Sequence, residues 1–168
     1  EFERRGLLEH LAEHLVLHGQ VPSRFGTFTE AEVKKLLNEL IIHYPVQFIQ
    51  VVKREIISEP QMQWLNRAVN FTELTRSAGY LHTQQRALTG ILAALYDALG
   101  KITVAGITTS TLQEIVFRKF LNAWARNNWK SVSTTQVWNE LLWDACIKHG
   151  FSKKNFLAGM LKGKSFLP

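Results

Sequence analysis

The sequence is poor in the features that mark secreted and membrane proteins. Its one cysteine, Cys146, cannot form an internal disulfide, which favours a cytoplasmic setting. No apolar run approaches the roughly 18–20 residues of a membrane span, so we expect no membrane segment. The chain begins at Glu1, without methionine and without a charged and then apolar signal segment. We therefore expect one domain, residues 1–168, that belongs to a longer protein.

Acidic residues are absent from the end of the chain. The formal net charge is +6, and no aspartate or glutamate follows Asp144. The lysines of this segment are Lys148, Lys153, Lys154, Lys162 and Lys164. A basic balance permits an acidic protein partner or a nucleic acid. Arginine, the residue most used to read bases, is absent after Arg126, so we expect a protein partner rather than a nucleic acid.

Catalytic motifs are also missing. The sequence contains no phosphate-binding glycine loop, no nucleophile elbow and no Cys-His arrangement with local support. The acidic residues are spread through helical patterns at capping or surface positions. We expect no enzymatic activity and no cofactor.

Helical patterns fill most of the chain. Apolar residues recur at three- and four-residue spacing in segments that begin near Phe2, Thr29, Pro45, Ser58, Phe71, Thr83, Ser110, Ser133 and Ser152. Four of these starts, at residues 29, 58, 110 and 133, have the spacing of a capping box. Glycines at 19, 79, 100 and 150 are placed to end helices. Residues 101–109 are expected to form a loop. The pattern predicts an all-α fold of about eight helices, packed as antiparallel hairpins, without a significant sheet.

The opening helix carries a possible metal motif. His10-Leu-Ala-Glu-His14 fits H-x-x-E-H, the inverted zinc-protease signature, in which two histidines bind the metal and the glutamate is the base. His18 follows one turn later on the same face. A hydrolytic zinc needs a third protein ligand, and no downstream glutamate lies in a recognisable ligand motif. We therefore expect no metal site, with His10, His14 and His18 as solvated histidines; a metal site formed by these three is the alternative.

Tryptophans are concentrated in the last third, at positions 124, 129, 138 and 143. Trp124 and Trp138 lie on apolar stripes and are predicted to be core residues. Trp129 lies in the connection between two helices, where it could pin them together or contact a partner. Aromatic residues beside basic ones can also stack bases, although we do not favour that function here. The candidate partner contacts are Trp129, Lys130, Lys153, Lys154 and Lys162.

Several stretches of the chain, spread over most of its length, resemble segments of one protein family. The later ones are Val116-Phe-Arg-Lys-Phe-Leu121 and the stretch from Trp138-Asn-Glu-Leu-Leu142 to Gly150. Leu15-Val-Leu-His-Gly-Gln-Val-Pro22 has a helix end, a glycine, an apolar residue and a proline in the order found there. Tyr44-Pro-Val-Gln-Phe-Ile-Gln-Val-Val-Lys53 and Gln63-Trp-Leu-Asn-Arg-Ala-Val69 are similar to the helices that follow. These segments resemble the tape measure proteins of contractile injection systems, the phage-tail-like machines. Residues 23–25 depart from that pattern, which commonly has tryptophans after the proline.

The resemblance implies a structural component, one helical domain of a tape measure protein. Such a protein sets the length of the inner tube and helps to assemble it on the baseplate, so tube and baseplate components are the implied partners. Two alternatives remain from the residues themselves. The first is a helical scaffold or adaptor that binds a protein partner in a groove, and the second is a nucleic-acid-binding helical module.

Overall fold

The structure is a computed structural model that describes residues 2–102, 108–143 and 154. The described part of the chain is all-α, with no strand. Its α-helices are α1 (Phe2–His18), α2 (Glu30–His43), α3 (Pro45–Arg54), α4 (Glu59–Ala68), α5 (Phe71–Leu81), α6 (Arg86–Leu99), α7 (Thr109–Ala125) and α8 (Thr134–Trp143). Three short 3-10 helices join them: η1 (Ser23–Phe25), η2 (Thr83–Gln85) and η3 (Trp129–Val132). The predicted fold class is confirmed.

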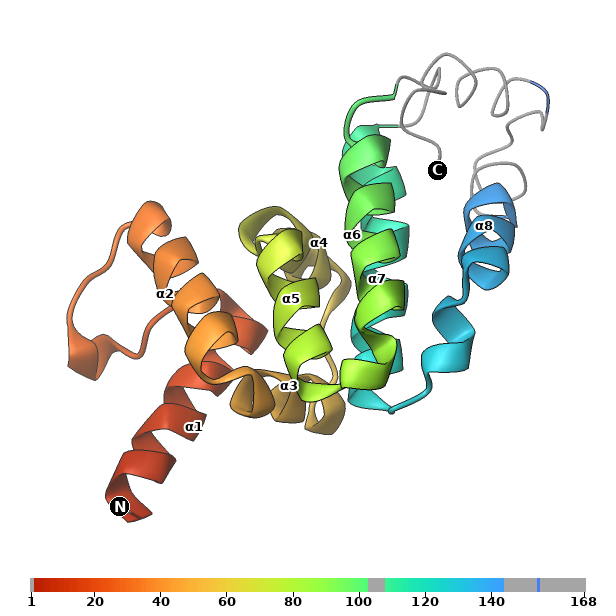
Figure 1. Ribbon diagram of the computed structural model, residues 1–168. Helices are drawn as coiled ribbons and strands as arrows, with labels where there is room; N and C mark the ends of the chain where they lie inside the picture. Colours follow the sequence, from red (N-terminus) through yellow and green to blue (C-terminus); the bar gives the residue numbers. More distant parts are fainter. Residues whose placement is uncertain (1, 103–107, 144–153, 155–168) are drawn as a thin grey trace.

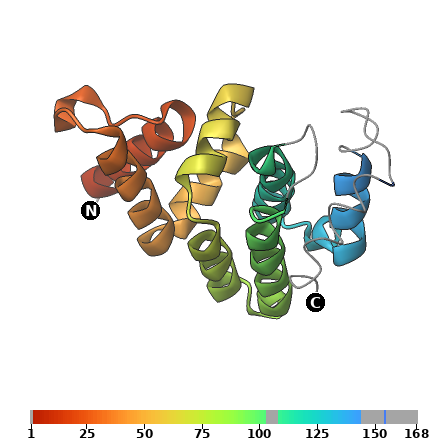
Figure 2. The same ribbon diagram turned by 90° about the horizontal axis from the view of Figure 1, so that it is seen from above.

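The helices form an elongated body with α1 and α2 at one end and α8 at the other (Figures 1 and 2). α5 and α6 form an antiparallel hairpin, and α7 returns antiparallel to α6. α7 is the central helix, since it packs against α3, α4, α6 and α8. α2 and α5 depart from the hairpin pattern, because they lie side by side and run in the same direction (Figure 1).

Most helix starts are those that the capping residues predict. Thr29 forms a complete capping box: its hydroxyl accepts from the Glu32 amide at 3.2 Å, and the Glu32 carboxylate accepts from the Thr29 amide at 3.3 Å. Ser58 accepts from the Gln61 amide at the start of α4. The prediction that Ser110 caps the start of α7 is wrong. The Thr108 hydroxyl accepts from the Thr111 amide, so the helix is capped two residues earlier.

Two other predicted boundaries are also corrected. Gly79 does not end α5, which continues to Leu81. An added Cβ at Gly79 would lie 3.2 Å from the Thr89 hydroxyl on α6, so this glycine allows the two helices to pack closely. The segment expected to be one helix from Thr83 to Leu99 begins as the 3-10 helix η2. Gly19, with φ of +61°, ends α1 as predicted.

One hydrophobic core runs through the body. Its largest fully buried side chains include Phe48 of α3 and Phe117 and Phe120 of α7. Trp124 is buried, as predicted. Trp138 is only half-buried against this core, so its prediction as a core residue is confirmed in part.

Polar side chains fix the helices relative to one another. The Asn38 amide on α2 donates to the Ala68 carbonyl at 2.9 Å and accepts from the Asn70 amide at 2.7 Å. Tyr96 on α6 donates to the buried Asn66 side chain of α4 at 2.8 Å. Arg118 on α7 forms a bidentate pair with Glu59 at the start of α4. The two Asn38 bonds hold α2 against the end of α4 and the start of α5.

Several predictions lie outside the described residues: the last helix from Ser152, the helix end at Gly150, the environment of Cys146, and part of the loop at 101–109. Among the described helices, none combines the length and the apolar character that crossing a membrane requires.

Candidate protein-binding surface

The histidines of the opening motif form a row on α1, where His10 and His14 are half-buried and His18 is exposed. Burial, and then repulsion from His10 and His18, lowers the pKa of His14. Glu13, the base of a zinc-protease interpretation, instead accepts from Arg54 of α3 at 2.6 Å. No group of three or more His, Cys, Asp or Glu side chains in the described part could hold a metal ion. These observations argue against a three-ligand hydrolytic centre on α1.

Trp129 lies on η3 and is only 9% exposed. Its ring packs against Phe120 and His82, with centroid separations of 5.9 and 5.3 Å. Its Nε1 donates to Asn127 Oδ1 at 3.0 Å, and Asn127 has a φ of 50° where α7 ends. Asparagine tolerates this left-handed conformation better than most residues. Trp129 therefore holds the turn after α7 against the η2 segment.

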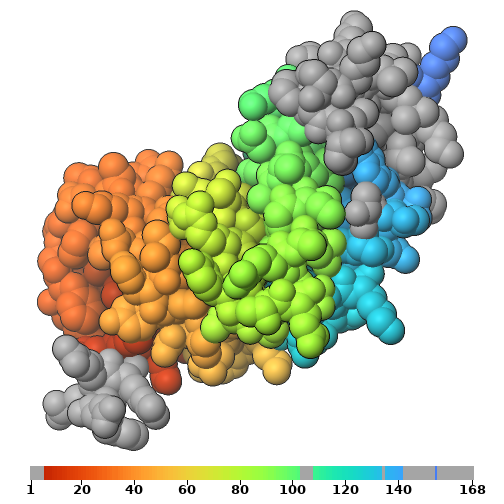
Figure 3. Space-filling model, in the orientation of Figure 1, coloured from red at the N-terminus to blue at the C-terminus, as the bar shows by residue number. Residues whose placement is uncertain are grey.

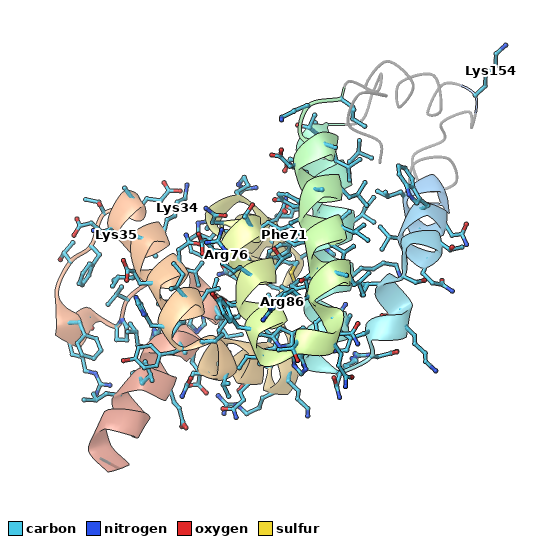
Figure 4. The ribbon with its side chains drawn as sticks, in the orientation of Figure 1. Lys34, Lys35, Phe71, Arg76, Arg86 and Lys154 are labelled. Carbon is cyan, nitrogen blue, oxygen red and sulfur yellow. The ribbon has the colours of Figure 1, made fainter. Side chains whose placement is uncertain are left out.

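Only two of the lysine candidates belong to the described residues. Lys130 is exposed on η3 beside Trp129. Lys154 is also exposed, and it lies far from Arg86 at the start of α6 (Figure 4). Lys153 and Lys162 lie outside the described residues.

A different set of residues forms an exposed apolar surface where α2 and α5 end. The Ser77 hydroxyl on α5 donates to the Ile41 carbonyl on α2 at 3.1 Å. Because the two helices run in the same direction, the residues one turn later on each lie at the same end of the body. We name this region, where α2 and α5 end, the Tyr44–Tyr80 surface, and its exposed apolar residues are Ile42, Tyr44, Val46, Tyr80 and Leu81. At its edges, Val46 lines a hollow with Leu8 and Glu9 of α1, and Leu81 lines another with Asn127 and Trp129. Helices α2, α5 and α6 form one continuous face of the molecule (Figure 3).

Local sequence explains why Tyr44 and Val46 are exposed. α2 cannot continue through Pro45, which lacks an amide hydrogen, and the proline becomes the first residue of α3. The chain therefore turns a corner at Tyr44, which is 47% exposed. Tyr80 lies in the last turn of α5 and is 72% exposed. Neither tyrosine side chain is used in the core.

The two segments that build this surface, residues 40–54 and 74–96, contain no aspartate or glutamate. The acid beside it comes from another helix, since Glu9 of α1 lines the hollow next to Val46. The Arg86 guanidinium carbon lies 5.9 Å from the centroid of the Tyr80 ring, within cation–π range. Arg76 and Arg86 project from neighbouring helices on this face (Figure 4). His43 at the end of α2 contacts Glu39 at 3.3 Å, and Arg76 contacts Glu73 at 2.9 Å, so both acids lie just outside the two segments.

Comparison with known proteins does not assign the chain to a family. Its sequence matches no protein-family model and no curated protein, and its structure matches no solved structure.

Sequence reasoning missed the Tyr44–Tyr80 surface. Two signals for it were readable: the acid-free segments, and a tyrosine directly before the proline that breaks a helix. The proximity of the two segments could not be predicted from the sequence, because the contact between Ser77 and Ile41 joins residues 36 positions apart.

Proposed function

We propose that this chain is a non-catalytic helical scaffold that binds a protein partner through the Tyr44–Tyr80 surface, as a structural and assembly component. The observation that carries the proposal is the pair of exposed tyrosines, Tyr44 and Tyr80, at the ends of α2 and α5, with further exposed apolar residues beside each in the chain. Single exposed apolar residues are ordinary on a protein surface, whereas exposed aromatic residues brought to one end of a molecule are typical of interaction sites.

The composition of the surface supports a protein partner. Tyrosine is enriched at protein interfaces, because it presents a large apolar ring and a polar hydroxyl group with few rotatable bonds. Arg86 adds a cation that is already held over the Tyr80 ring. Aromatic residues and arginine are also the types that most often dominate binding energy.

The charge of the surface indicates the chemistry of the partner. The segments 40–54 and 74–96 carry no acid, and Arg86 lies over the Tyr80 ring, which favours an acidic partner over a basic one at this point. We propose that the partner presents carboxylates around an apolar centre. Binding should therefore weaken as salt concentration rises.

The finer proposal is a domain of a contractile injection system tape measure protein, and it is supported by the sequence resemblance alone. The first three similar segments fall at the end of α1, along α3 and along α4, and a later one falls within α7. Tyr44, at the start of the second segment, also belongs to the Tyr44–Tyr80 surface. On this proposal the partner is a tube or baseplate component, and the protein acts in the cytoplasm during assembly.

Loss of the two tyrosines tests the proposed function. The double variant Tyr44→Ser/Tyr80→Ser should fold normally, since both rings are exposed and neither belongs to the core. We expect it to lose a partner that co-purifies with the wild-type chain. Ile56→Ser is the matched control, because Ile56 is 97% exposed beyond the far end of α3. Equal recovery of the partner with both variants would contradict the proposal, and a partner that is not a tube or baseplate protein would contradict only the finer assignment.

A further inference from the structure

The row of three imidazoles on α1 has a geometry that the scaffold function does not use. The His10 and His14 ring centroids are 4.6 Å apart, and those of His14 and His18 are 5.5 Å apart. Both pairs are separated by four residues, so each lies on one side of the helix. In both pairs the ring planes are inclined at 61° rather than stacked.

These separations allow two imidazoles to share a metal ion. An imidazole nitrogen binds zinc at about 2.0–2.1 Å, so two rings on one ion have centroids about 4.5–5.5 Å apart for ligand angles of about 90–120°. The 4.6 and 5.5 Å separations fall at the two ends of this range. His14 belongs to both pairs, so it would be the shared ligand.

The groups around the row do not add a third ligand. Glu13 is paired with Arg54 of α3, and Arg24, whose guanidinium carbon lies 5.0 Å from the Phe25 ring centroid, is a cation. The described residues contain no group of three or more possible metal ligands. The site therefore offers two imidazoles, His14 and one of its neighbours.

We propose that His14, with either His10 or His18, binds a first-row transition ion of the Zn²⁺, Ni²⁺ or Cu²⁺ class, with water in the remaining coordination positions. Nitrogen ligands favour these ions over Mg²⁺ and Ca²⁺. The site differs from the inverted zinc-protease motif, because it has two protein ligands and its glutamate is paired with another helix. It is independent of the proposed protein-binding function.

Zinc titration of the tag-free chain, by calorimetry at about pH 7.5, tests the site because imidazole is mostly neutral there. His14→Gln removes the shared ligand and should weaken binding by at least about tenfold, since even residues that only support a ligand cost about 10–100-fold. His10→Gln and His18→Gln should each weaken it by no more than about fivefold, because one pair remains. The double variant His10→Gln/His18→Gln should match His14→Gln. His43→Gln is the control and should bind as the wild type does.

The double variant keeps the test valid if His14→Gln fails to fold, because it leaves the half-buried His14 in place. Zinc binding that is unchanged in His14→Gln or in the double variant would overturn the proposal. Equal weakening by His43→Gln would also overturn it. Free imidazole is mostly protonated at about pH 5.5. A zinc affinity that is no weaker at this pH than at about pH 7.5 would show that histidines are not the ligands.

Discussion

Replacement of Trp129 by alanine tests whether this residue holds the fold together or contacts a partner. The indole is 9% exposed and contacts Phe120 and His82. Truncation of a buried tryptophan to alanine costs about 3–5 kcal/mol, through lost burial and the cavity that remains. We expect Trp129→Ala to lower the free energy of unfolding by this amount.

Trp129→Phe separates the ring from its hydrogen bond. It keeps an aromatic ring against Phe120 but removes the donor to Asn127 Oδ1. The expected cost is about 1–2 kcal/mol, since it combines a lost hydrogen bond with a smaller ring. Lys130→Ala is the matched control on the same 3-10 helix, and as an exposed substitution it should stay within about 0.5 kcal/mol of the wild type.

Urea unfolding followed by far-ultraviolet circular dichroism gives these free energies, because helix dominates the signal. The reasoning fails if Trp129→Ala unfolds at the same urea concentration as the wild type. Trp129 would then be dispensable for the fold, and the prediction that it contacts a partner would become the better explanation.

Three further predictions concern the fold. Gly19→Ala should destabilise by about 1–2 kcal/mol, because φ is +61° and the new Cβ would lie 3.3 Å from the Trp64 ring; Gly6→Ala, with open space around it, should be neutral or stabilising in a thermal melt. Leu141→Ala should cost about 2–5 kcal/mol in urea unfolding, since this side chain is fully buried; an unchanged midpoint would place it outside the core. Burial raises the pKa of Tyr96 from 10.0 to about 12, so its contribution to stability is complete below about pH 10 and is lost as pH rises through about 12; in Tyr96→Phe, alkaline destabilisation over this range should be smaller than in the wild type.

The local part of the fold could be predicted from the sequence. Thr29 with Glu32 and Pro45 at the start of α3 act within one helical turn, so residue type alone locates those boundaries. Boundaries that depend on other helices could not be predicted in this way. Gly79 resembles a helix end in sequence, but its lack of a side chain serves the contact between α5 and α6. Likewise, the apolar stripe that contains Trp138 predicts that this face of α8 points inward, but it does not predict how much of the indole ring is buried.

The candidate surface depends on a long-range arrangement. Tyr44 and Tyr80 are both recognisable as residues at helix ends, and the lack of nearby acids is visible in the sequence. That they belong to one surface follows only from the parallel course of α2 and α5, which the bonds of Asn38 and Ser77 maintain. α3 and α4 lie between these two helices in the sequence, so no local pattern predicts that they pack side by side.

Site-specific photo-crosslinking of the full chain in its native cells tests the central claim most directly. A benzophenone amino acid placed at position 80 should form one discrete adduct with a partner protein, whose contact region carries acidic residues. The same group at position 56, equally accessible but outside the Tyr44–Tyr80 surface, should form no such adduct. The same adduct from both positions, or none from position 80 while the chain remains folded, would contradict a protein-binding role for this surface.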